Sequence, residues 1–503
     1  MSVDVPEVVA GHPAKSVRRC KVCFWVLTIL LLLSVLTILW LVLRFTIDEP
    51  VVYEDPVEHF KYGSTGGERE SGFPYWIWKA LPKVCADYLP GEGYASLGML
   101  YEEDKDLPIG VSKRRVTGLD RVFLNCAVCH TNTLRDTPDS VPQIITGMPA
   151  NTLDLFSFEQ FFFNCAADAR FSPDFIMPVI ESMDADLDLI DRYLVYPLAV
   201  YLMRDQVLML KERFKFVEHQ PVWGPGRVDT FNSAKVIFNF PLDKARPEEL
   251  VGTTDFPSIW NQRQKEGMHL HWDGNNTRLQ ERNRSAAFGA GATPPTLDRE
   301  SVKRMEEWLM DSKPPPWAWS VDKALSSKGA EIYAHYCAEC HGASGTDFTG
   351  AQVGKVLTID EIGTDRYRLD SYTRTLAVNQ NLLYTGYGDE RFSNFRKTNG
   401  YANMPLDGLW LRAPYLHNGS VPTLQDLLSP AADRPQQFYR GYDVYDPVNV
   451  GFVTTVAAEG DKSFFLFDTN VAGNSNRGHE GAAYGTQLSI SDKQALLEFL
   501  KTF

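Results

Sequence analysis

Positive charge is in short supply in this chain of 503 residues. Lys and Arg number 50 against 64 Asp and Glu, so the formal net charge at pH 7 is −14. No basic stripe offsets this acidic surplus, which argues against a nucleic-acid partner. Cysteine is also scarce, with eight residues, whereas the hydrophobic fraction of 44% is ample for large cores. The length favours two to four domains.

A cleavage site is missing after the long apolar run near the N-terminus. Val22 to Leu43 carry no charge, and a run of this length can cross a bilayer as a helix. Arg44 follows the run where a signal peptide would have small residues. We therefore expect residues 22–45 to be an uncleaved transmembrane signal anchor. Basic residues precede the run and acidic residues follow it, namely Lys15, Arg18, Arg19 and Lys21, then Asp48 and Glu49.

This charge asymmetry predicts how the chain crosses the membrane. Basic residues favour the cytoplasmic side, so residues 1–21 should be a cytoplasmic N-terminus. The rest of the chain should be exported. The expected localisation is the bacterial inner membrane, with a single pass and with the remaining domains in the periplasm.

Four of the eight cysteines lie in two C-x-x-C-H motifs, which are typical of covalent haem c attachment. The two thiols bond to the haem edge, and the histidine supplies a nitrogen ligand to the iron. A zinc knuckle or a redox dithiol is the alternative for one C-x-x-C pair, but a histidine follows both pairs. We therefore predict two covalently bound haem c groups. The two motifs are Cys126, Cys129 and His130, and Cys337, Cys340 and His341.

The other four cysteines indicate the compartment. Cys85 and Cys165 could form a disulfide, which would suit the oxidising environment outside the cytoplasm. Sequence alone does not settle that pairing. Cys20 precedes the apolar run and Cys23 lies at its start. Lipidation is one reading of these two cysteines, and we expect free thiols.

The remaining pattern predicts a mainly α fold with two tandem cytochrome c-like domains and long irregular loops. Pro314-Pro315-Pro316 cannot continue a helix and marks the boundary between an N-terminal haem domain, 46–313, and a C-terminal cytochrome c domain, 314–503. Residues 50–115 should form an irregular wrap. Apolar spacing predicts helices over 155–165, 190–215 and 297–311, and a short helix is expected over 118–125.

The C-terminal domain has the pattern of two crossing helices. Gly329 and Tyr333 precede Cys337 at four-residue spacing, which puts a small residue and an aromatic on one helix face. Near the C-terminus, Ser491 and Gln494 form a predicted capping box before an apolar run. A motif-bearing helix crossed by a terminal helix is the cytochrome c arrangement.

Three further segments carry a resemblance to a known family. They are Trp272-Asp273-Gly274, the stretch from Pro405 through Pro414-Tyr415-Leu416-His417 to Pro422, and Gly473 to His479. With the two haem motifs, they resemble the bacterial di-haem cytochrome c peroxidase superfamily, and most of all its rubber oxygenase branch. The resemblance covers residues 118–503. It implies an oxidoreductase that uses O₂ or peroxide at the N-terminal haem, while the C-terminal haem transfers electrons.

The resemblance also implies roles for three aromatic residues. Trp272 corresponds to a tryptophan that relays electrons between the two haems. Phe288 resembles a distal-pocket phenylalanine, and Trp223 is a candidate for the same pocket. Ordinary core packing is the alternative for all three.

The second iron needs a ligand opposite His341, and the family's peroxidases supply a methionine there. Ala431 holds that position here and cannot ligate. His479 is the favoured replacement because its loop precedes the terminal helix. His417 is the competitor, with a hydrogen-bonding role as its expected function, and Met404 comes third. The histidines that could approach the first haem are His219, His269 and His271.

Two classes of function follow from the ligand question. An open first iron would make the chain a dioxygenase or a peroxidase, whereas ligation by His271 would make it a non-catalytic electron carrier. The expected partners are the inner membrane, a periplasmic or membrane redox partner, and O₂ or peroxide. We also expect a structural Ca²⁺ between the two domains.

Overall fold

The computed structural model describes residues 1–6 and 14–503, with the backbone alone for residues 14–20. The side chains of Lys15, Arg18, Arg19 and Cys20 therefore lie outside the described part. The chain forms two units. Unit 1 consists of Met1–Glu49 and Arg115–Asp120, and unit 2 consists of Pro50–Arg114 and Arg121–Phe503.

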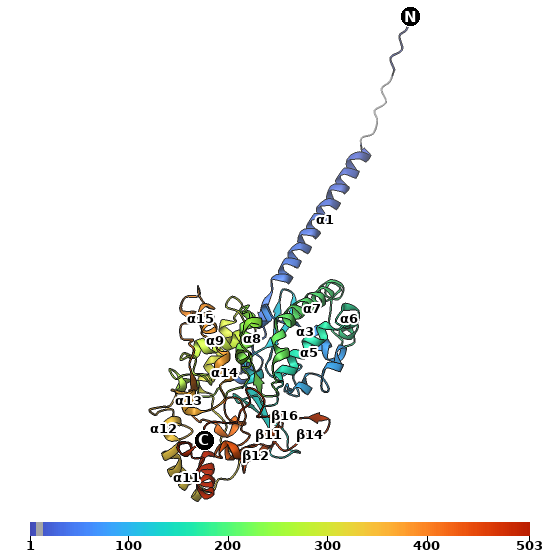
Figure 1. Cartoon of the computed structure of the whole chain (residues 1–503). Helices are drawn as coiled ribbons and strands as arrows, with labels where there is room; N and C mark the ends of the chain where they lie inside the picture. The colour runs from blue at the N-terminus through green and yellow to red at the C-terminus, as the bar shows by residue number, and fades with distance from the viewer. Residues whose placement is uncertain (7–13) are drawn as a thin grey trace. The chain divides into compact units, whose positions relative to one another are not determined.

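Helix α1 (Ala14–Thr46) dominates unit 1 (Figure 1). Within its part from Lys21 to Thr46, an 18-residue window has a mean hydropathy of 2.9, and this is, among the described helices, the one long and apolar enough to cross a membrane. The hydroxyls of Thr28, Ser34 and Thr37 each donate to a backbone carbonyl four residues earlier. The polar side chains of the run are thus satisfied within the helix, as an apolar surrounding requires. A membrane anchor and a signal sequence both fit these properties.

Unit 2 is dominated by helices. The whole structure is 44% helical with 12% strand, so the mainly α prediction is confirmed. The region before residue 314 carries the following helices: α2 (Pro56–Tyr62), α3 (Tyr75–Val84), α4 (Cys126–Cys129), α5 (Leu155–Ala167), α6 (Pro173–Glu181), α7 (Tyr196–Arg213), α8 (Thr230–Ile237), α9 (Leu279–Gly289) and α10 (Arg299–Asp311).

Three helices agree with their predicted ranges. They are α5, α10, and α7 together with the π-helical turn Asp191–Val195 that precedes it. The helix expected over 118–125 is wrong, because Leu119–Leu124 is strand β4. Thr117 and Gly118 have φ values of 50° and 79°, as in a tight hairpin turn, which sends the chain into a strand. The irregular wrap expected over 50–115 contains helices α2 and α3.

A disulfide joins two helices of this region. Cys85 lies at the C-terminal cap of α3 and Cys165 lies in α5, with their Cα atoms 5.7 Å apart. The disulfide that the sequence left open is thus present. It closes a loop that contains the first haem motif.

The region after residue 314 is built on two crossing helices, α11 (Lys323–Tyr336) and α17 (Ile490–Leu500), with α12 (Ala338–His341) following α11. Gly329 is the point of closest approach, because a Cβ there would lie 2.0 Å from the carbonyl oxygen of Ala495. Tyr333 is buried against Phe499. The cap of α17 differs from the prediction: Ser489 accepts the N–H of Asp492, and Ile490 begins the helix.

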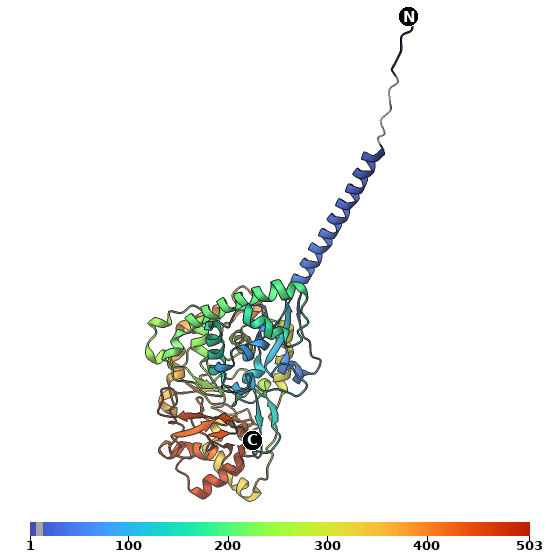
Figure 2. The same cartoon turned by 90° about the vertical axis from the view of Figure 1, so that its right-hand side faces the viewer.

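A four-stranded sheet that includes β4 and several short antiparallel strand pairs complete the described fold (Figure 2). Pairs that bear on the sites are β9 (Val356–Thr358) with β10 (Gly400–Ala402), and β11 (Gln437–Arg440) with β16 (Phe465–Asp468). Hydrogen bonds cross the predicted boundary at residue 314, including Thr133 to Asp443 at 2.6 Å and Asn151 to the Ala413 carbonyl at 2.8 Å. Both haem motifs lie in this one unit, and the two-domain division stays a prediction.

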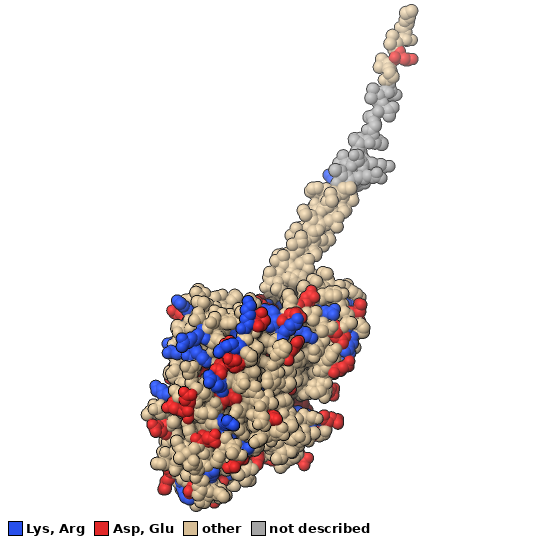
Figure 3. Space-filling model, in the orientation of Figure 1, with Lys and Arg blue, Asp and Glu red and all other residues tan. Residues whose placement is uncertain are grey.

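The charged surface of unit 2 is mixed in sign. Figure 3 shows Lys and Arg side chains interspersed with Asp and Glu over the visible face, without a large field of one sign. This distribution matches the absence of a basic stripe in the sequence.

Candidate haem sites

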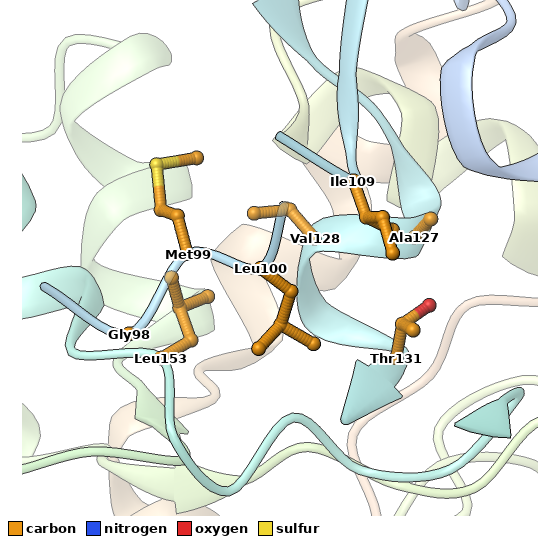
Figure 4. A pocket seen from close by; sticks show the side chains of 8 residues that line it. All are labelled: Gly98, Met99, Leu100, Ile109, Ala127, Val128, Thr131 and Leu153. Carbon is orange, nitrogen blue, oxygen red and sulfur yellow. The ribbon is translucent and has the colours of Figure 1, made fainter. Parts of the chain in front are cut away.

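The first haem motif lies on the short helix α4. Asn125 caps this helix by accepting the N–H of Ala127 at 2.9 Å, and its amide group donates to the carbonyls of Lys61 and Gly63. On the back of the helix, Ala127 and Val128 pack toward Ile109 (Figure 4). The void on that side is only about 10 Å³, so α4 is held without room to shift.

A much larger cavity of about 260 Å³ lies on the other side of the motif. Cys126, Cys129 and His130 all line it. Aromatic and aliphatic side chains form much of its wall, so it suits a large, flat, mostly apolar group such as a haem. Further lining residues are Glu159, Phe231, Phe256, His271, Trp272, Arg282, Phe288, Met305 and Arg368.

His130 is prepared to act as a ligand. Its Nδ1 lies 2.9 Å from the carbonyl oxygen of Pro257, so Nδ1 carries the proton and Nε2 keeps a free lone pair. Such a bond orients a metal-binding imidazole and raises its basicity as a ligand. Burial, together with the nearby Arg282, lowers the pKa of His130 to about 3, so the ring is neutral at pH 7.

The second motif repeats this arrangement. The Nδ1 of His341 donates to the carbonyl oxygen of Met404 at 2.7 Å, which again leaves Nε2 free. The ring of His479 lies opposite, with the two ring centroids 6.3 Å apart. An imidazole nitrogen binds a first-row metal at about 2.0 Å, so two imidazoles on opposite sides of one metal have centroids about 6 Å apart. The pair therefore fits one iron between the two rings.

The loop of His479 is hydrogen-bonded to Ala431, the position where the family's peroxidases have a methionine ligand. The backbone N–H of Ala431 donates to the carboxylate of Glu480 at 2.8 Å. Arg434 donates to the carbonyls of Gly478 and His479 at 3.0 and 3.3 Å. His479 has a φ of 49°, and its Nδ1 is buried without a hydrogen-bond partner. The loop thus brings an imidazole to the region that Ala431 leaves without a ligand.

His417 is engaged elsewhere. The hydroxyl of Tyr401 donates its proton to the carbonyl of Asp365 at 2.8 Å, so it can only accept from His417 Nε2, 3.0 Å away. The ring of His417 also stacks on Tyr401. Nε2 of His417 therefore carries a proton, which disfavours it as a metal ligand. The carbonyl of Met404 accepts a hydrogen bond from His341. The assignment of His479 as the iron ligand opposite His341 stays a prediction.

Comparison with known proteins supports a cytochrome. Residues 400–440 match the family described as RoxA-like, cytochrome c-like. Over these residues the chain is similar to that family. This segment contains Met404, whose carbonyl accepts from His341, and Ala431, whose backbone N–H donates to Glu480 beside His479. It also contains His417. A domain of this family implies haem c.

Two proteins of Sinorhizobium fredii are similar over longer stretches. The uncharacterized protein y4iJ is 28% identical, with 84% of this chain and 85% of the relative covered. The uncharacterized protein y4iM is 30% identical, with 45% of this chain and 57% of the relative covered. Neither name assigns an activity, so the reaction must be argued from the site.

Of the three histidines expected near the first haem, His271 alone is among the residues that line the large cavity. A guanidinium nitrogen of Arg368 lies 3.3 Å from His271 Nδ1. Because an arginine can only donate, Nδ1 must accept, and the proton sits on Nε2. Burial, with Arg282 and Arg368 nearby, holds the pKa of His271 well below its usual range. His271 is therefore a neutral ring that offers an N–H.

Arg368 is itself fixed by an ion pair. It is almost fully buried and lies 3.1 Å from Asp273, which belongs to the Trp-Asp-Gly segment. A third bond runs from Arg368 to the hydroxyl of Thr254 at 3.2 Å. Asp273 thus holds the arginine that sets the tautomer of His271.

The predicted aromatic residues divide into two groups. Trp272 and Phe288 line the cavity, whereas Trp223 does not appear in its wall. Trp223 is fully buried, packs against Phe156 and donates its N–H to Gln220. The N–H of Trp272 donates to the Asp255 carbonyl at 2.9 Å.

The backbone of Trp272 connects it to the second site. Its carbonyl accepts the N–H of Ala402 at 2.8 Å, two residues before Met404. Met404 in turn holds His341. Trp272 therefore contacts the first cavity through its side chain and the frame of the second site through its backbone.

Sequence reasoning missed Glu159, Arg282 and Arg368. Glu159 is the one with a visible signal, because it is the sole acidic residue in α5, among five phenylalanines. An acidic residue in such an apolar helix indicates a buried carboxyl group with a functional role. In the structure it lines the cavity, and its Oε2 is buried without a partner.

The Glu159 carboxyl should make stability depend on pH. Burial, aided by Asp229, raises its pKa to about 8, whereas an unfolded chain releases this proton near pH 4.3. The contribution of the protonated carboxyl to the free energy of unfolding is complete below the pKa of the unfolded chain. This contribution is lost as the pH rises through the pKa of the folded chain. We expect Glu159→Gln to gain stability relative to the parent chain, by up to about 4 kcal/mol between about pH 5 and about pH 8.

Denaturant unfolding at several pH values measures this difference. Asp174→Asn, at an exposed position in α6, is the control. Its free energy of unfolding should differ from that of the parent by the same amount at every pH. A constant difference between Glu159→Gln and the parent across this range would show that the carboxyl does not keep its proton in the fold.

The calcium prediction gains no support from side chains. Among the described residues, no group of three or more His, Cys, Asp or Glu side chains could hold a metal ion.

Proposed function

We propose that this chain is a membrane-anchored di-haem c-type cytochrome that acts as an oxidoreductase. The N-terminal haem, on Cys126, Cys129 and His130, would use O₂ or peroxide. The C-terminal haem, on Cys337, Cys340 and His341, would transfer electrons. Residues 22–45 would anchor the chain in a bacterial inner membrane with the haem-bearing part in the periplasm, where a redox partner supplies or accepts electrons.

The asymmetry between the two motif histidines carries this proposal. His341 has another histidine at the separation that one shared metal requires. His130 faces a large cavity, and the other histidine in its wall, His271, offers a proton rather than a lone pair. An iron with one protein ligand can bind O₂ or peroxide, whereas one with two mainly passes electrons. The two sites thus suit different tasks.

The chain's own residues supply the surroundings of the reaction. The Nε2–H of His271 can donate a hydrogen bond to a polar guest in the cavity, and Arg368 holds it in that form. Phe288 and the other apolar residues of the wall exclude water, which strengthens such a bond. A bound haem would supply the redox-active iron.

Haem content and spin state test the proposal. Intact mass and haem-stained denaturing gels should show two covalent haems per chain, and spectroscopy should show one high-spin and one low-spin haem. One haem or none would contradict the di-haem assignment. Two low-spin, six-coordinate haems would contradict the enzyme and support the alternative, an anchored electron carrier.

His271 gives the electron-carrier alternative its structural basis. In the other tautomer its Nε2 would carry a lone pair and could bind the iron. His271→Ala discriminates the two functions. If the proposal holds, the first haem keeps its high-spin signature in the variant. If His271 is a ligand, the parent is low-spin at this haem and the variant becomes high-spin.

Trp272 should couple the two haems. We predict that Trp272→Phe retains both haems but slows electron equilibration between them by about tenfold or more, because phenylalanine lacks the readily oxidised indole and the N–H bond to Asp255. Flash photolysis or stopped-flow reduction measures the rate. Phe288→Leu, which changes the same cavity wall, is the control. An unchanged rate would make Trp272 a packing residue.

A further inference from the structure

Helix α7 carries an apolar surface that unit 2 does not cover. Two side chains just before it, Tyr193 and Leu194, and four along it are each more than half exposed. We call this set the α7 face: Tyr193, Leu194, Leu198, Tyr201, Leu202 and Met209. Isolated exposed leucines are ordinary, but a cluster such as that from Tyr193 to Leu202 marks an interaction surface. Met209 lies about two turns further along, beyond the exposed Asp205 and Gln206.

The opposite side of α7 is already occupied. Tyr196, Val200 and Met203 are buried there against unit 2. Arg204 donates to the carbonyl of Ala166 in α5 at 3.0 Å and so fixes the rotation of the helix. Figure 2 shows this helix running along one edge of the unit. The α7 face is therefore held outward and cannot turn into the core.

The chain itself indicates what covers this face. Unit 2 begins at Pro50, after only Ile47, Asp48 and Glu49 beyond the end of α1 at Thr46. These residues span at most about 14 Å when fully extended. If α1 crosses a membrane, as the proposed function holds, unit 2 cannot leave the bilayer surface. A lipid surface is then the apolar partner that always lies beside unit 2.

The composition of the α7 face also fits a lipid interface. Tyrosines beside leucines are typical of the boundary between headgroups and acyl chains. The charges of α7 are mixed, with three basic residues and two acidic ones: Arg204, Lys211 and Arg213, and Asp205 and Glu212. The helix therefore has little net attraction for anionic lipid, and apolar burial must supply the affinity.

We propose that the α7 face inserts into the interface of the bilayer that α1 spans, parallel to the surface and independently of anionic lipid. This inference rests on the proposed anchor. The membrane would then hold unit 2 at two places, which fixes the orientation of its haem sites toward a membrane-bound redox partner.

Depth-dependent quenching tests the inference in the full-length holo-protein. In a Cys20→Ser, Cys23→Ser background, Leu198→Cys, Met209→Cys and the control Ile490→Cys each take one environment-sensitive fluorophore. Ile490 is 78% exposed at the start of α17. Each labelled protein is reconstituted into phosphatidylcholine nanodiscs with and without lipids that carry a nitroxide on the acyl chain.

We expect both α7 positions to be quenched at least threefold more than position 490. Leu198 and Met209 are about 16 Å apart along the helix axis, so quenching of both indicates a helix that lies flat. Quenching at one position only, or equal to that at Ile490, overturns the inference. Shielding of the fluorophore from solvent without lipid quenching, in discs that hold two chains, also overturns the inference. That result would make the α7 face a contact between two copies of the chain.

The result separates this inference from the anchor itself. A chain that does not incorporate into nanodiscs overturns the anchor, and with it the inference. A chain that incorporates without quenching at α7 overturns the inference alone. Adding anionic phosphatidylglycerol should change the quenching ratio by less than twofold, and a requirement for it would contradict apolar insertion.

Discussion

His479→Ala is expected to convert the second haem from low-spin to high-spin, while the first haem stays as it is. The ring of His479 is at the separation from His341 that one shared metal requires. Alanine offers no donor, and Ala431 leaves no methionine to take the place. Optical and electron paramagnetic resonance spectra of the holo-protein would report the change.

Two further variants make this prediction specific. His417→Ala should leave the second haem low-spin, because the Nε2 of His417 donates to Tyr401. His479→Met should restore six-coordination with a thioether and raise the reduction potential, since methionine ligation favours higher potentials. A high-spin second haem in His417→Ala, with a low-spin one in His479→Ala, would reverse the ligand assignment.

Gly329→Ala should destabilise the fold by about 3 kcal/mol, near the upper end of the usual cost of overpacking. The added Cβ would lie 2.0 Å from the Ala495 carbonyl, so α11 and α17 must separate. Backbone atoms cannot move aside as a flexible side chain does. Denaturant unfolding followed by circular dichroism would measure the loss.

Gly289→Ala is the comparison, because this glycine is also helical and a Cβ there meets no protein atom within 4 Å, at the wall of the large cavity. It should be neutral or stabilising by up to about 1 kcal/mol, as expected for alanine in a helix. Equal effects of the two substitutions would mean that helix propensity, not the crossing of α11 and α17, determines the loss at Gly329.

Local spacing was enough to predict several parts of the structure. The crossing at Gly329, the long helices and the two motif turns follow from patterns within a few residues. The sequence also indicated His479 as a candidate ligand, because Ala431 stands where the family's peroxidases have a methionine ligand. In each of these cases, nearby residues carry the physical constraint.

Other features depend on residues that are far apart in the chain. The tautomer of His271 is set by Arg368, and Arg368 is set by Asp273, so no local pattern announces it. Strand β4 replaced the expected helix because the turn at Thr117-Gly118 outweighs the weak helical pattern after it. Ser489 rather than Ser491 caps α17, since two serines separated by one residue give nearly the same capping signal.

The disulfide between Cys85 and Cys165 has a consequence for how the protein is assembled. Cys126 and Cys129 follow Cys85 in the chain and precede Cys165. If the chain is exported as proposed, they are therefore the first thiols that Cys85 meets. Haem attachment needs those two thiols reduced, whereas the Cys85–Cys165 bond needs oxidation. Assembly must therefore protect Cys126 and Cys129, and attaching the haem early would do so by removing both thiols from exchange. Starving cells of haem should accordingly yield chains with mispaired cysteines rather than a folded apoprotein.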